Sequence, residues 1–251
     1  ERLPGLQTMT LTNLGIAYAR SQQYEKARHH LLLALEHSEA SHTYYKYGDI
    51  CMALGYIEFH RKALDKAHQF TTRAWHFYTA IENEDMQIQS MINLGTIEGG
   101  RNQFKAAEQQ LLAAAKKANT AELTSHEAHA YEELAEVYLA CKPESPDQLQ
   151  KAQAMLEKAL DLYTDGIRQA AAQQLLAEVH VHQGRIDQAI ETLMSAAEVL
   201  EKTEARPQLA EVYSRLGELH QEQGNSEQAT EFLHNSVKIF REMQVRAHEV
   251  Q

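Results

Sequence analysis

The feature that most constrains this chain is a pair of residues that returns at a nearly constant interval. The pair is a leucine followed by a glycine or an alanine, and it first occurs at Leu14-Gly15. It returns at Leu54-Gly55, Leu94-Gly95, Leu134-Ala135, Leu176-Ala177 and Leu216-Gly217. The residue number rises by forty at every step except the fourth, where it rises by forty-two. A fixed period of this length indicates a repeat protein in which each repeat is one supersecondary unit.

Two further small residues follow each pair. In the first repeat, Gly15 is followed by Ala27 and then by Ala34. The equivalent positions hold Ala67 and Ala74, Ala107 and Ala114, Ala152 and Ala159, Ala189 and Ala196, and Ala229 and Ser236. Small side chains let two antiparallel helices approach closely, and each helix pair must then be covered by the next one.

We therefore predict an all-α fold of six helix pairs. The low content of helix breakers, with 4 Pro and 11 Gly, agrees with this fold. Large residues such as Leu14, Leu54, Leu94 and Leu216 are expected to fill the seams between helices. The predicted repeats are residues 8–47, 48–87, 88–127, 128–169, 170–209 and 210–249, and they form a single domain over 1–251.

One repeat departs from the rule. The interval from Ala135 to Ala152 is five residues longer than the interval from Gly15 to Ala27. The extra residues surround Pro143 and Pro146, which forbid a continuous helix. We expect a local protrusion over 141–147.

With the spacing established, the repeats resemble the tetratricopeptide repeat family. Its pattern of Leu-Gly, a tyrosine three residues on, an alanine and then a large apolar residue is met by Leu14-Gly15, Tyr18, Ala27 and Leu31. The period of forty exceeds the usual length of about 34. This long variety resembles the repeat arrays of peptide-sensing regulators of Gram-positive bacteria, the Rap/NprR/PlcR-like group. The resemblance implies a right-handed α-α superhelix whose first helices line a concave groove that holds a peptide or protein.

The net charge of −11 limits the range of partners. Acidic residues spread along the chain disfavour contact with phosphate backbones and anionic membranes. The sequence lacks a run long enough to span a bilayer, and its 2 cysteines do not form a disulfide framework. We therefore expect a cytoplasmic protein that contacts neither nucleic acid nor membrane directly.

Catalytic and metal-binding patterns were sought next. The 14 histidines include no HExxH frame and no spacing with a partner cysteine. The sequence also has no phosphate-binding glycine loop, nucleophile elbow or credible Ser-His-Asp set. We predict that the chain is not an enzyme and needs no metal or cofactor.

Two asparagines stand at the same place in two repeats. Asn13 and Asn93 each come directly before the Leu-Gly pair. An asparagine amide donates and accepts at once, which suits it to hold the backbone of an extended peptide. The resemblance implies that role for these two residues; the alternative is that each caps or solvates a helix face. Other repeats carry Ala53, Glu133, Leu175 and Arg215 there, so a complete asparagine ladder is absent.

Two other groups lie at positions that the register places on the groove. Tyr56, Phe59 and His60 form either an aromatic pocket or a packing cluster with Trp75 and Phe77 behind it. Glu132, Glu133 and Glu136, with Glu178, either attract a basic ligand side chain or form a solvated charged face. The complete set of predicted peptide-binding residues is Asn13, Arg20, Tyr56, Phe59, His60, Asn93, Thr96, Glu132 and Glu136.

These observations predict a peptide- or protein-binding module. We expect it to be the ligand-sensing and oligomerisation domain of a cytosolic bacterial signalling or transcriptional regulator. The alternative is a scaffold that docks folded proteins without sensing peptides. The last repeat ends near Met243 with no clearly polar capping helix, which predicts a homo-oligomer.

Overall fold

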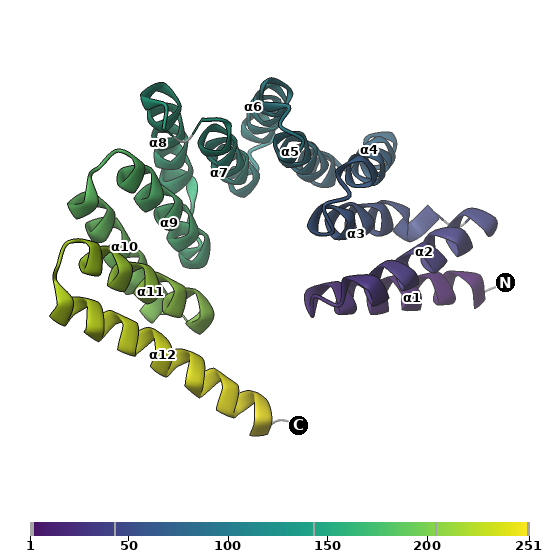
Figure 1. Ribbon diagram of the computed structural model, residues 1–251. Coiled ribbons are helices and arrows are strands. Elements are labelled where there is room, and N and C mark those ends of the chain that lie inside the picture. Colours follow the sequence, from purple (N-terminus) through teal and green to yellow (C-terminus); the bar gives the residue numbers. More distant parts are fainter. Residues whose placement is uncertain (1–2, 43, 143, 204, 250–251) are drawn as a thin grey trace. The chain divides into compact units, whose positions relative to one another are not determined.

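The computed structural model describes residues 3–42, 44–142, 144–203 and 205–249. This part of the chain contains α-helices and one short 3-10 helix, and it has no strand (Figure 1). The elements are α1 (Leu3–Arg20), α2 (Tyr24–Ala40), η1 (Tyr44–Lys46), α3 (Tyr47–His60), α4 (Leu64–Ala80), α5 (Glu84–Gly100), α6 (Phe104–Thr120), α7 (Thr124–Cys141), α8 (Pro146–Leu162), α9 (Gly166–His182), α10 (Ile186–Glu201), α11 (Arg206–Glu222) and α12 (Ser226–Glu249).

The predicted all-α repeat fold of six helix pairs is confirmed. In repeats three to six the first helix begins at Glu84, Thr124, Gly166 and Arg206, four residues before the predicted repeat starts at 88, 128, 170 and 210. The chain divides into two compact units, Glu1–Val137 and Tyr138–Gln251. The single domain over 1–251 stays a prediction.

The small residues of the repeat mark the places where the two helices of a pair meet. A Cβ atom added to Gly15 would lie 2.5 Å from Cγ of Leu31, and one added to Gly95 would lie 2.5 Å from Cγ of Leu111. In the second unit the same relation joins Gly217 to Leu233 at 2.6 Å. The close approach predicted from the sequence is therefore real, and it leaves no room for a larger side chain.

The seam leucines follow the prediction with one exception. Leu54, Leu94 and Leu216 are buried, whereas Leu14 is exposed. The core of the first pair is instead formed by Ala27, Leu31, Ala34 and Leu35. The prediction for Leu14 was wrong because it assigned the same surroundings to every repeat. Since α1 belongs to the first of the described pairs, no earlier described pair lies beside it.

The extra residues of the fourth repeat mainly lengthen its helices, and the protrusion over 141–147 stays a prediction. α8 begins at Pro146, six residues before Ala152, whereas α4 begins at Leu64, three residues before Ala67. The remaining two extra residues lengthen α7 and its connection to α8 by one each. The insertion therefore mainly adds a turn to the start of α8, because proline is well suited to the first position of a helix. Pro143 lies outside the described residues.

The first turn of the second repeat differs from its equivalents. α5 begins at Glu84, well before Gly95, whereas α3 begins at Tyr47, which is three residues closer to the equivalent Gly55. The three missing residues form η1, a 3-10 turn. Gly48 lies just after this turn, where an added Cβ would be 2.5 Å from Cζ of Tyr78. The start of α3 therefore lies close against the aromatic side chains of α4.

Candidate functional site

The first helices of the first unit share a face that points away from their helix partners. Its positions lie two residues before, one residue after and five residues after the glycine or alanine of each Leu-Gly or Leu-Ala pair. Spacings of three and four residues place them on one side of a helix. We call this the first-helix face, and its residues are Asn13, Ile16, Arg20, Ala53, Tyr56, His60, Asn93, Thr96, Gly100, Glu133 and Glu136, all at least partly exposed.

Most of the predicted site residues belong to this face. Phe59 and Glu132 are the exceptions, since each lies one position beside it and is half-buried. Asn13 and Arg20 are exposed on α1, Tyr56 and His60 are exposed on α3, and Asn93 and Thr96 are half-buried on α5. The role of all nine residues in peptide binding stays a prediction.

Asn93 has a neighbour that fixes its amide group. Gln89 lies one turn earlier on α5, and its Nε2 donates to Oδ1 of Asn93 at 2.9 Å. Within the described residues, the Nδ2 group of Asn93 makes no hydrogen bond and remains a donor. At the equivalent place on α1, one turn before Asn13, stands Met9, which cannot hold an amide in this way.

The aromatic residues of α3 are brought together, but with an unexpected partner. The rings of Tyr56 and His60 lie 4.2 Å apart between centroids. Tyr24, the first residue of α2, stacks on His60 at 5.4 Å with an interplanar angle of 4°. Phe59 meets His60 edge-on at 5.8 Å. Desolvation lowers the pKa of His60, with a smaller contribution from the charge of Lys62, and this favours the neutral form of the ring.

The packing alternative placed Trp75 and Phe77 behind the aromatic residues of α3. These two rings have other neighbours. Trp75 contacts His76, whereas Phe77 contacts Tyr47 and Tyr78. Tyr24 was not among the predicted site residues. The register contained a clue, because the same position holds a large apolar residue in later repeats, such as Leu64 and Phe104.

The acidic residues of α7 are partly engaged with their neighbours. Glu133 accepts a hydrogen bond from the Thr96 hydroxyl at 2.6 Å and lies 3.2 Å from Nε2 of His129. Desolvation, together with the smaller effect of the charges of Glu133 and Glu132, raises the pKa of Glu136 to about 7. Although its side chain stays partly open to solvent, Glu136 is therefore protonated for part of the time at neutral pH.

In the second unit, Glu178 already has a basic partner. Nε and Nη2 of Arg215 donate to its two carboxylate oxygens at 2.7 and 2.9 Å. Arg215 also donates to Glu218 at 2.9 Å. The Glu178 carboxylate is therefore already paired with a basic side chain of this chain, where a basic side chain of a ligand was predicted.

Neither a metal-binding group nor a membrane-spanning helix is found among the described residues. In that part of the chain, no three His, Cys, Asp or Glu side chains are grouped so that they could hold a metal ion. Among the described helices, none combines the length and the apolar character that a bilayer-spanning helix requires.

Comparisons with known proteins agree with the helical pairs. Residues 168–242 match a sequence model described as Tetratricopeptide repeat. A search of curated protein sequences finds no match. Among solved structures, BtubC (BKLC) from P. vanneervenii superposes with a TM-score of 0.68 at 13% identity, covering 97% of this chain and 93% of that chain.

Two further structures are those of a quorum sensor and of a conjugation gene regulator. The apo form of the quorum sensor NprR from B. thuringiensis gives a TM-score of 0.68 at 11% identity, covering 94% of this chain and 77% of that chain. The Rap conjugation gene regulator of the plasmid pLS20, in complex with the Phr* peptide, gives 0.60 at 13% identity, covering 93% and 73%. Residues 168–242 thus match the tetratricopeptide repeat, and the helical repeat fold of the chain resembles those of NprR and Rap.

Proposed function

We propose that the chain is a peptide-binding module and that an extended segment of a partner polypeptide lies along the first-helix face of the first unit. The observation that carries this proposal is the fixed amide of Asn93. Its Oδ1 is held by Gln89, so its Nδ2 donates outward to a backbone carbonyl of the partner. A donor fixed in advance loses little conformational freedom when the partner binds.

The other residues of the face supply the remaining contacts. Tyr56 and His60 offer ring surfaces to an apolar side chain beside the backbone contact. Glu133 is engaged with Thr96 and His129, and Glu136 is partly protonated at pH 7. A single basic side chain of the partner, rather than a polybasic segment, therefore suits this end of the face. The similarity in fold to the peptide-bound Rap regulator supports the same proposal.

Selection of a random peptide library on the full chain, followed by calorimetry, tests this function. A selected peptide is titrated into the wild type and into the Asn93→Ala, Asn13→Ala and Gln109→Ala variants. Gln109 is the matched control, because it is an exposed amide on a second helix, α6. Asn93→Ala is expected to weaken binding about tenfold, or about 1.4 kcal/mol.

Asn13→Ala is expected to cost less, because Met9 leaves that amide free to rotate. Gln109→Ala is expected to leave the Kd unchanged. Equal Kd values for the wild type and all three variants, or the recovery of no binding peptide, would contradict the proposal.

We further propose that the module works in a cytoplasmic bacterial signalling or transcriptional regulator. NprR is a quorum sensor and the Rap protein is a conjugation gene regulator, and their similar folds support this assignment. Transcript profiles test this role. A strain carrying Asn93→Ala should show the same changes in transcript levels as a strain in which the gene for this chain is deleted. A strain carrying Gln109→Ala should not show these changes. A deletion strain whose transcripts match those of the wild type would contradict the regulatory role.

A second function, self-association, is favoured by α12. Val237 and Phe240 are 47% and 41% exposed and lie three residues apart on the same side of this helix. A contiguous exposed apolar patch is a feature of interaction surfaces. We propose a second copy of the chain as the partner. Light scattering should give a dimer mass for the wild type and for the control Lys238→Gln, and a monomer mass for Phe240→Glu; a monomeric wild type would contradict the proposal.

A further inference from the structure

A pocket lies at the opposite end of α3 from Tyr56 and His60. It has a volume of about 400 Å³ and is lined by Tyr44, Tyr47, Arg73, His76 and Phe77. This volume falls within the range of about 300–1,000 Å³ that is usual for binding sites. The pocket occurs where η1 replaces the first turn of α3, so the second repeat has a feature that the other repeats do not share.

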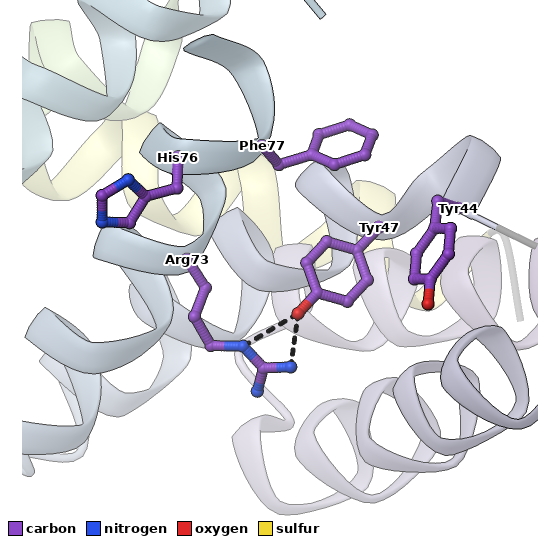
Figure 2. Close-up of a pocket in the computed structure, with 5 residues that line it drawn as sticks. All are labelled: Tyr44, Tyr47, Arg73, His76 and Phe77. Atoms are coloured by element: carbon purple, nitrogen blue, oxygen red, sulfur yellow. Dashed lines mark hydrogen bonds between the residues drawn. The ribbon is translucent and has the colours of Figure 1, made fainter. Parts of the chain in front are cut away.

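The rings of the pocket meet at open angles and do not stack. Tyr44 and Tyr47 are 5.6 Å apart at 73°, and Tyr47 and Phe77 are 5.5 Å apart at 45°. Figure 2 shows the Tyr47 ring at the centre of the group, with Arg73 and Tyr44 on either side. An inserted ring therefore meets one neighbour by its face and another by its edge, which is the arrangement that aromatic rings prefer.

The guanidinium group of Arg73 is held in place at one edge of the pocket. Nε donates to the Tyr47 hydroxyl at 3.0 Å, and Nη2 donates to the same hydroxyl and to Glu39 of α2. Glu39 balances its charge. Among the described residues, the hydrogen bonds of Arg73 come from Nε and Nη2, and Nη1 makes none. The pocket thus combines aromatic walls with a fixed donor and little net charge.

We propose that this pocket binds a tyrosine side chain of a partner polypeptide. The aromatic walls contact the ring, and Nη1 of Arg73 donates to the phenol oxygen. A cationic ligand is disfavoured by Arg73, and a purely aliphatic one leaves Nη1 without an acceptor. Tyr44 and Tyr45 are 46% and 78% exposed beside the pocket, and exposed tyrosines of this kind are enriched where proteins meet. The site does not depend on the first-helix face.

Nuclear magnetic resonance on the full chain tests the proposal. The side-chain Nε–Hε signal of Arg73 reports directly on the pocket during titration with N-acetyl-tyrosinamide, N-acetyl-phenylalaninamide and N-acetyl-leucinamide. The tyrosine derivative should shift this signal and saturate at a Kd at least threefold lower than that of the phenylalanine derivative. The leucine derivative should give no saturable shift.

Variants of two adjacent tyrosines provide the control. Tyr44→Ala should weaken binding of N-acetyl-tyrosinamide at least fivefold, because Tyr44 lines the pocket. Tyr45→Ala should leave the Kd unchanged, because Tyr45 is more exposed and is not among the lining residues. Arg73→Lys should remove the preference for tyrosine over phenylalanine.

Three results would overturn the proposal. The first is the absence of any saturable shift of the Arg73 signal, and the second is an equal effect of Tyr44→Ala and Tyr45→Ala. The third is tighter binding of free tyrosine than of its blocked derivative, which would assign the pocket to a free amino acid instead of a polypeptide.

Discussion

Arg28 of α2 donates from Nε to the carboxylate of Glu58 on α3 at 2.6 Å, and the Glu58 side chain has no solvent-exposed surface. The second oxygen of Glu58 accepts from Nη1 of Arg61 at 2.8 Å. Arg61 in turn donates to Glu25 of α2 at 2.9 Å. These four charged residues connect the first repeat to the second. A buried carboxylate is tolerated here because both of its oxygens are paired.

Arg28→Ala is expected to lower the free energy of unfolding by about 1–3 kcal/mol, because it leaves one oxygen of the buried Glu58 unpaired. Lys117→Ala removes the more exposed ion pair with Glu84 and should cost less than about 1 kcal/mol. Urea denaturation of the two variants provides the comparison. Equal losses would show that the burial of Glu58 carries no energetic weight.

Replacement of Gly95 tests the close approach of α5 and α6. An added methyl group meets Cγ of the fully buried Leu111 at 2.5 Å, so Gly95→Val should cost about 1–3 kcal/mol or more. Gly100→Ala is the control, because its nearest neighbour is Phe59 at 3.2 Å and alanine favours the helix. Thermal denaturation should rank Gly95→Val below Gly100→Ala. The reverse order would contradict the packing described for the repeat.

The two thiols should differ in reactivity. Cys51 is buried, and desolvation raises its pKa to about 12, so almost no thiolate is present at pH 8. Cys141 is only partly buried. A thiol reagent at pH 8 should therefore modify Cys141 first in the native protein and both thiols in denaturant. Rapid modification of Cys51 in the native protein would contradict its burial.

Glu136 should make stability depend on pH in a particular direction. Its pKa of about 7 lies above the ordinary value for glutamate of 4.5, so the folded chain binds the proton more tightly than the unfolded chain. Ionisation of Glu136 therefore destabilises the fold as the pH rises from 5 to 8. The Tm of Glu136→Gln should exceed that of the wild type at pH 8 and approach it at pH 5. A difference that is the same at both values would contradict the raised pKa.

The repeat period predicted the helix pairs because their packing depends on small residues at fixed separations along the chain. Gly15, Gly95 and Gly217 each contact the same position of the following helix, so one rule covers three repeats. The same rule failed where surroundings differ between repeats. Leu14, in the first described pair, is exposed, whereas its equivalents Leu54, Leu94 and Leu216 are buried. In the fourth repeat, the five extra residues before Ala152 mainly extend α8.

The candidate site was only partly predictable because side chains from different helices complete it. The register placed Tyr56 and His60 on one face of α3, but it did not indicate that Tyr24 of α2 stacks on His60. Glu133 was grouped with its acidic neighbours, although its closest hydrogen-bond donor is Thr96 on another helix. A spacing along one helix gives no information about the rotamers that link it to the next.

Photo-crosslinking gives the most direct test of the central claim, that a polypeptide binds along the first-helix face. A benzophenone amino acid is placed at Tyr56 on this face or at Leu112 on α6, two side chains that are 49% and 44% exposed. Irradiation with a selected peptide should produce a covalent adduct from position 56 and none from position 112. An adduct from position 112 alone, or equal yields from both positions, would contradict the account.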